Sequence, residues 1–88
     1  MPYIRQKDRD HIDAKLEKLV VVTPGELNYA VTRLVLNYLK TQEQCAGKLG
    51  YQDINDALGA LEGAKLEFYR RYAARYEDCK KAENGDVY

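Results

Sequence analysis

The sequence is short of the residues on which most catalytic and metal sites are built. Its 88 residues include no serine, no tryptophan, one phenylalanine, one histidine and two cysteines. Neither a serine nucleophile nor a glycine-rich phosphate loop is present. His11 is the only histidine, and Cys45 and Cys79 lack the CxxC spacing of a zinc site. We therefore expect a protein that is not an enzyme and has no metal or cofactor.

Long apolar runs are also missing. No stretch approaches the roughly 18 residues of a membrane-spanning helix. The opening segment MPYIRQKDRD is charged from residue 5 onward, unlike a secretory signal peptide. We expect a cytoplasmic protein with no membrane partner and with reduced thiols. Whether Cys45 and Cys79 approach each other is open at this stage.

An excess of either charge is absent too, because 14 basic residues balance 14 acidic ones. Proteins that bind duplex DNA normally carry a basic excess. Nucleic acid is therefore an unlikely partner, although a local basic pocket for a small anion is compatible with this balance. In contrast, tyrosine is abundant, with eight copies. Its apolar ring and polar tip suit half-buried positions and interfaces.

The chain length and the apolar spacing predict one all-α domain, residues 1–88. A chain this short has a thin core and often gains stability by oligomerising. Apolar residues recur at helical spacing in three segments, so we expect a three-helix bundle with a long C-terminal helix. The segment TQEQCAGKLG is expected to be a loop. The predicted helices run from Asp8 or Asp10 to Leu19, from Pro24 to about Lys40, and from Tyr51 or Gln52 to about Glu83.

The second helix has the clearest start signal. Thr23 is a good N-cap, Pro24 suits the first helical position, and Glu26 can complete a capping box. The apolar stripe behind this start is broad enough to be buried on two sides. It comprises Leu27, Val31, Leu34 and Tyr38, widened by Ala30, Val35 and Leu39.

In the third helix the aromatic rings of EFYRRYAARYED continue an aliphatic stripe. At about 100° per residue, one arc holds both kinds of side chain, so Phe68 and Tyr72 are expected in the core. Gly85 or Asn84 is expected to end the helix in a left-handed C-cap. The arc comprises Ile54, Leu58, Leu61, Phe68, Tyr72, Tyr76 and Cys79.

Lys65 lies inside this stripe, between Leu61 and Phe68. A lysine there must pair, extend its amine to solvent, or face a cavity. One interpretation is an internal pair with Glu62, three residues earlier. The other is a cation placed where an anionic ligand meets the helix.

Arginines and tyrosines border the same stripe. Glu67 can pair with Arg70 and Arg71, and Arg75 with Asp78, as ordinary solvated ion pairs. Alternatively, guanidinium groups beside tyrosine rings suit a planar, phosphate-bearing ligand. On the second helix, Asn28 and Thr32 share a face as core hydrogen-bonding groups or as ligand contacts. The candidate ligand-binding residues are Lys65, Tyr69, Arg71, Tyr72, Arg75, Tyr76, Asn28 and Thr32.

The opposite face of the third helix carries Gly59 and Gly63, with Leu66 and Ala73. Glycine inside a helix costs about 1 kcal/mol relative to alanine. Two glycines four residues apart therefore suggest the close approach of another helix. Because three helices leave little to cover this face, we expect a homo-oligomer.

Several segments together resemble a family of short uncharacterised proteins found in bacteriophages and bacteria. They are PYI, GELNYAVT, GALE.AK.EFYRR, YED.K and NGDVY, spread over nearly the whole chain. The resemblance implies no settled activity and no functional residues. It suggests a phage-like protein in the host cytoplasm, and small phage proteins include oligomeric sponges that sequester signalling nucleotides.

Two classes of function fit these observations. The first is a non-enzymatic oligomeric sponge that sequesters a phosphate-bearing small molecule such as a signalling nucleotide. The second is a protein-protein interaction module or an inhibitor of a host protein, since tyrosine and arginine dominate interface hot spots.

Overall fold

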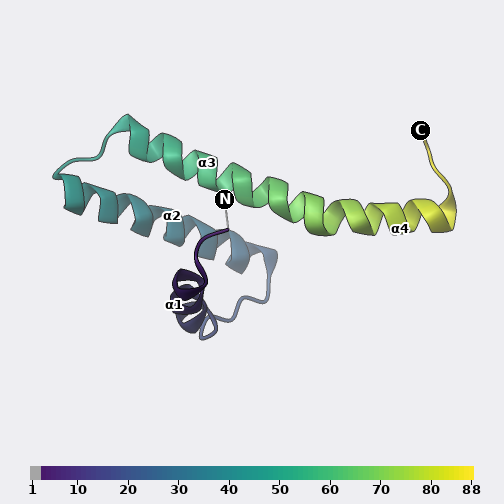
Figure 1. Cartoon of the computed structure of the whole chain (residues 1–88), viewed down its shortest axis with the longest axis horizontal. Coiled ribbons are helices and arrows are strands. Elements are labelled where there is room, and N and C mark those ends of the chain that lie inside the picture. Colours follow the sequence, from purple (N-terminus) through teal and green to yellow (C-terminus); the bar gives the residue numbers. More distant parts are fainter. Residues whose placement is uncertain (1–2) are drawn as a thin grey trace. The chain divides into compact units, whose positions relative to one another are not determined.

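The computed structural model describes residues 3–88, and within these residues it contains helices and no strand (Figure 1). This confirms the predicted all-α fold, a small bundle of three helical segments of which the C-terminal one is long. The elements are α1 (Gln6–Leu16), α2 (Pro24–Ala46), α3 (Tyr51–Phe68), the π-helical turn η1 (Tyr69–Ala73) and α4 (Ala74–Asn84).

The first helix, α1, begins at Gln6, before the predicted start at Asp8 or Asp10. It ends at Leu16 and not at the predicted Leu19. Its start has no side-chain cap on the backbone, but Arg5 and Asp8 form an ion pair at 3.2 Å across the first turn. The amide of Leu19 bonds the carbonyl of Leu16 in a tight turn. Residues 20–22, three β-branched valines, then lie outside any helix, which agrees with the lower helix propensity of such residues.

The start of α2 follows the sequence closely. The Thr23 hydroxyl accepts from the Glu26 amide at 3.0 Å, and the Glu26 carboxylate accepts from the Thr23 amide at 3.0 Å. The predicted capping box is therefore confirmed. The predicted end of α2 near Lys40 was wrong. The helix continues to Ala46 and is capped by Gly47, whose φ is 85°. Residues 41–44 are polar, but their Gln and Glu residues, like Ala46, are good helix formers.

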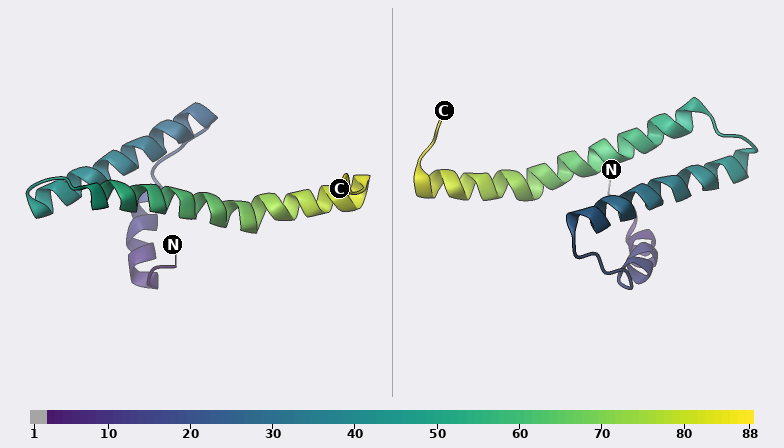
Figure 2. Two further views of the ribbon diagram at one scale, coloured as in Figure 1. Left: turned by 90° about the horizontal axis from the view of Figure 1, so that it is seen from above. Right: turned by 180° about the vertical axis from the view of Figure 1, so that it is seen from behind.

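Two compact units divide the described chain, and each is considered by itself. The first, Tyr3–Leu58, holds α1, α2 and the beginning of α3. Near the connecting loop, α2 and the first turns of α3 lie side by side and antiparallel (Figures 1 and 2). The Asp53 carboxylate accepts from the Gly50 amide at 2.9 Å and so caps the start of α3.

The second unit, Gly59–Tyr88, is one helical run followed by a short tail. The run is not the uninterrupted α-helix that the sequence predicted, because the π-helical turn η1 separates α3 from α4. It ends at Gly85, the expected residue. The φ of Gly85 is 89°, but its ψ of 156° places it outside the left-handed helical region. The expected left-handed C-cap is therefore not formed at Gly85.

Burial within the described residues is slight. Ala57 is the one buried hydrophobic residue, at 7% exposure. The expectation that Phe68 and Tyr72 belong to the core was wrong, since they are 64% and 71% exposed. Both lie in the unit Gly59–Tyr88, which has no second helix to cover them. No helix among residues 3–88 has the length and apolarity to cross a membrane.

Candidate functional site

The π-helical turn falls in the middle of the aromatic and basic segment EFYRRYAARYED. The amide of Ala74 bonds the carbonyl of Tyr69, five residues earlier, where an α-helix bonds four residues back. Such a turn holds one extra residue, so everything after it is rotated by about 100° relative to a regular helix. Turns of this kind are frequent at functional sites.

The rotation brings Tyr69 and Glu77 onto one face. Residues eight apart in a regular α-helix differ by about 80° in direction, and the extra residue reduces this to about 20°. The Tyr69 hydroxyl accordingly donates to the Glu77 carboxylate at 3.0 Å. This hydrogen bond, and then the negative charge of Glu77, raises the pKa of the Tyr69 phenol above its ordinary value of about 10.

The rings of Phe68 and Tyr72 stack on each other at the start of the π-helical turn. Their centroids are 5.6 Å apart and their planes differ by 11°. Aromatic pairs in this geometry contribute roughly 0.5–1.5 kcal/mol beyond the area they bury. Both rings are largely exposed, at 64% and 71%, so the stacked pair lies at the surface of the run.

Three of the candidate ligand-binding residues on this helical run are cationic: Lys65, Arg71 and Arg75. Lys65 is three residues before Phe68, and its side chain is 75% exposed. Its amine lies 3.9 Å from the Glu62 carboxylate, so the predicted pair is present, but at the surface and not inside a core. Arg71 lies 3.9 Å from the Glu67 carboxylate, a contact that Glu67 shares with Arg70 at 2.7 Å. Exposed pairs at such distances contribute a few tenths of a kcal/mol.

Arg75 and Tyr76 differ in their side-chain contacts. The predicted ion pair between Arg75 and Asp78 does not form in the part of the chain that the structure describes. Tyr76 instead has the Lys80 amine over its ring, 5.7 Å from the centroid. The Arg75 guanidinium is thus exposed and has no carboxylate partner among residues 3–88.

The remaining two candidates, Asn28 and Thr32, belong to the unit Tyr3–Leu58 and lie on α2. The Thr32 hydroxyl donates to the Asn28 carbonyl at 2.9 Å. This bond satisfies the hydroxyl's donor within the helix and leaves its oxygen as an acceptor. The other six candidates lie on one helical run, but on more than one side of it, because the π-helical turn rotates the last two by about 100°. These six are Lys65, Tyr69, Arg71, Tyr72, Arg75 and Tyr76.

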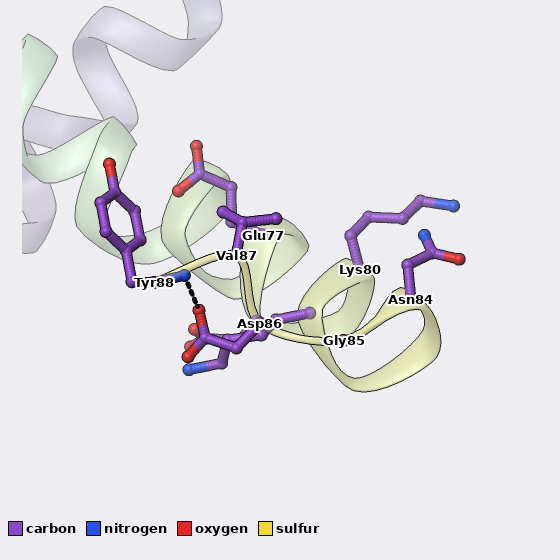
Figure 3. A pocket seen from close by; sticks show the side chains of 9 residues that line it. Glu77, Lys80, Asn84, Gly85, Asp86, Val87 and Tyr88 are labelled. Atoms are coloured by element: carbon purple, nitrogen blue, oxygen red, sulfur yellow. Dashed lines mark hydrogen bonds between the residues drawn. The ribbon is translucent and has the colours of Figure 1, made fainter.

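A hollow of about 390 Å³ lies at the end of the same unit. After Gly85 the tail turns back, and Val87 and Tyr88 line the hollow together with Glu77 (Figure 3). The Tyr88 amide donates to the Asp86 carboxylate at 2.9 Å, which holds this turn. Glu77 therefore takes part in two features: it lines the tail hollow, and it accepts a hydrogen bond from the Tyr69 hydroxyl.

Sequence reasoning missed two residues of this site, Phe68 and Glu77. Phe68 was assigned to the core because it continues an apolar stripe, and only the absence of a covering helix in its unit makes it a surface ring. Glu77 was missed because, in a regular α-helix, it would point about 80° away from Tyr69. Only the π-helical turn brings the two side chains onto the same face. Among residues 3–88, no three histidine, cysteine, aspartate or glutamate side chains are grouped so that they could hold a metal ion.

Comparison with known families identifies the chain at the level of family only. The profile of the family described as Domain of unknown function (DUF6899) matches residues 1–87. The chain therefore belongs to this family. Searches of curated proteins and of solved structures give no match.

Proposed function

We propose that this member of the family is a non-enzymatic, oligomeric binding protein that holds a phosphate-bearing planar small molecule at the π-helical turn. The observation that carries the proposal is the exposed Phe68–Tyr72 stack with cationic side chains on the same helical run. A flat base stacks on the rings, and Lys65 and Arg71, which flank them, pair with phosphate oxygens. Arg75 follows the π-helical turn and is rotated away from these rings, so it would meet a phosphate only on the far side of the run. The rings supply stacking energy with any base, because every base has a π face.

The mode of action is sequestration. The ligand is held and no bond is broken, which agrees with the lack of a nucleophile motif in the sequence. Signalling nucleotides, such as cyclic dinucleotides, combine the flat bases and phosphates that this face suits. In a bacteriophage, a protein of this kind would lower the free concentration of a host signal in the cytoplasm, as a sponge.

The oligomer has a specific role in this proposal. A single helical run offers the ligand one side only, and small-molecule sites normally enclose most of the ligand surface. A second copy of the chain, placed against the face that carries Phe68 and Tyr72, supplies the opposing wall. The site is therefore formed between chains.

The test begins with the purified full-length chain. It is denatured and any released nucleotides are identified, and the protein is then titrated with cyclic dinucleotides and cyclic ADP-ribose isomers by calorimetry. We expect one class to bind and Lys65→Ala to weaken that binding at least about tenfold, the scale of one lost charge-assisted bond. Lys48→Ala, which removes an exposed lysine from the loop after α2, is the matched control. If none of these compounds binds, the ligand proposal is wrong.

The alternative, a module that binds or inhibits a host protein, is favoured by one specific observation. Large apolar side chains are widely exposed, and 26 of those among residues 3–88 are at least 38% exposed. Exposed apolar surface of this extent marks protein interfaces. Recovery of a host protein at one-to-one stoichiometry, together with no nucleotide binding, would favour this alternative.

A further inference from the structure

One apolar stripe on α2 is open to solvent along its length. Leu27, Val31, Leu34 and Tyr38 follow each other at spacings of four, three and four, the spacing of a coiled-coil seam. All four are exposed. The same spacing continues to Thr41 and Cys45, which are exposed as well. The Thr41 hydroxyl donates to the Asn37 carbonyl at 2.9 Å, so burying this residue leaves no donor unsatisfied.

The residues on the two sides of this stripe are partly buried within the unit Tyr3–Leu58. On one flank Val35 and Leu39 are half-buried. On the other, a groove of about 510 Å³ separates α2 from the connector that follows α1. Ala30, on that side, is half-buried too. The stripe between the flanks stays exposed, as does most of α2, and Leu34 of the stripe borders the groove.

The charged side chains of α2 lie outside the stripe. At about 100° per residue, all four charged side chains point roughly 100–160° away from its centre. The positions that flank a coiled-coil seam, where charges usually select the partner, carry amides and small apolar groups here. Two identical stripes can therefore meet without charge repulsion. The four charged residues are Glu26, Arg33, Lys40 and Glu43, and the flanking ones are Asn28, Ala30, Val35, Asn37, Gln42 and Gln44.

We infer that this stripe is the contact between two copies of the chain, with the two α2 helices antiparallel. The inference rests on the self-association in the proposed function and names a surface for it beyond the glycine face. The spacing is symmetric about residue 36. An antiparallel partner therefore sets Leu27 against Cys45, Val31 against Thr41, and Leu34 against Tyr38, each aliphatic residue facing one of different size or polarity. The antiparallel arrangement also opposes the two helix dipoles, which favours it.

The stripe keeps apolar surface that a second copy can cover. Its four residues Leu27, Val31, Leu34 and Tyr38 are between 38% and 54% exposed. Burying apolar surface contributes about 25 cal/mol for each Å² removed from water.

The test compares two leucines of nearly equal exposure on opposite sides of α2. Leu34, on the stripe, is 53% exposed, and Leu36, on the charged side, is 48% exposed. We expect Leu34→Glu to weaken self-association on the order of 100-fold, because it places two unpaired carboxylates in the contact. Leu36→Glu should leave association unchanged. Light scattering over a concentration series measures both, with circular dichroism to verify helix content.

The outcomes separate this inference from the proposed function. If the wild type is oligomeric and Leu34→Glu assembles as well as Leu36→Glu does, the stripe is not the contact and the ligand proposal is unaffected. If the wild type is a monomer at micromolar concentration, the inference fails together with the self-association in the proposed function. If the stripe is confirmed but no nucleotide binds, only the ligand proposal fails.

A cysteine test keeps the inference falsifiable should Leu34→Glu fail to fold. In Leu27→Cys combined with Cys79→Ser, oxidation should join Cys45 to the new thiol of the other chain. Within one chain these positions are about 27 Å apart along the helix, too far for a disulfide. Leu36→Cys with Cys79→Ser is the control and should not cross-link to Cys45. Peptide mapping that finds only 45–45 and 27–27 links would overturn the antiparallel arrangement.

Discussion

The two compact units of this chain use helices differently. In Tyr3–Leu58, α2 is a regular helix whose start is fixed by a capping box and whose end is fixed by Gly47. In Gly59–Tyr88, the helical run contains a π-helical turn and has no comparable side-chain cap at that interruption. The first exposes a stripe without charge, and the second exposes rings beside cations.

This difference teaches that one short chain can present two kinds of surface. An uncharged stripe loses little when water is removed from it, so it suits a dry contact with another helix. A face of arginine, lysine and tyrosine retains its water until an anionic or planar partner replaces it. The predictions below are ways to break or sharpen this contrast, and they run from the largest effect to the smallest.

The largest effect is expected at Ala57, the one buried hydrophobic residue among residues 3–88. Ala57→Leu adds three carbons where there is little room, and we expect it to lower the free energy of unfolding by about 1–3 kcal/mol. Ala60→Leu, one turn further along the same helix and exposed, is the control. Urea unfolding of both variants measures the effect. Equal stabilities would mean that the unit Tyr3–Leu58 has no core around Ala57.

The second effect is expected two residues later, in the other unit. A Cβ added at Gly59 would meet no atom within 4 Å. Within one chain, Gly59→Leu should therefore raise helix stability, by up to about 1 kcal/mol. If another copy approaches this glycine closely, the same change should dissociate the assembly. Light scattering and thermal unfolding on one sample test both, and a more stable but still fully assembled variant would contradict the close approach.

The smallest effect concerns the titration of Tyr69. Since the raised pKa of this phenol reflects its hydrogen bond to Glu77, the bond's contribution to stability is present below about pH 10. It is lost as the pH rises through the higher pKa of the folded state. We expect Glu77→Gln to lower the pKa of Tyr69 toward its ordinary value.

Tyrosine ring signals, followed by NMR through an alkaline titration, measure that shift. Glu83→Gln removes a carboxylate that pairs with Lys80 and lies outside the causes of the raised pKa, so it is the control. If Tyr69 titrates identically in both variants and the wild type, the hydrogen bond across the π-helical turn does not form in solution.

Much of the fold could be predicted because its signals are local. The capping box of Thr23 and Glu26 needs four consecutive residues, and the end of the C-terminal run at Gly85 needs a single glycine. The boundary of α2 was missed because a polar segment was taken for a loop, although its residues form helix well. Six of the eight candidate site residues lie on one helical run, and their role in binding stays a prediction.

What the sequence determined by itself is the class of structure and the chemistry available: an all-α chain without a nucleophile motif, rich in tyrosine and balanced in charge. Only the three-dimensional structure decided which apolar residues are buried. An apolar stripe in the sequence indicates that a helix face can be buried, but it does not indicate whether another element buries it. For Leu34 and Phe68 the chain's own residues leave that face open. The structure also decided the pairing of Tyr69 with Glu77, because one extra residue in a turn rotates everything that follows it.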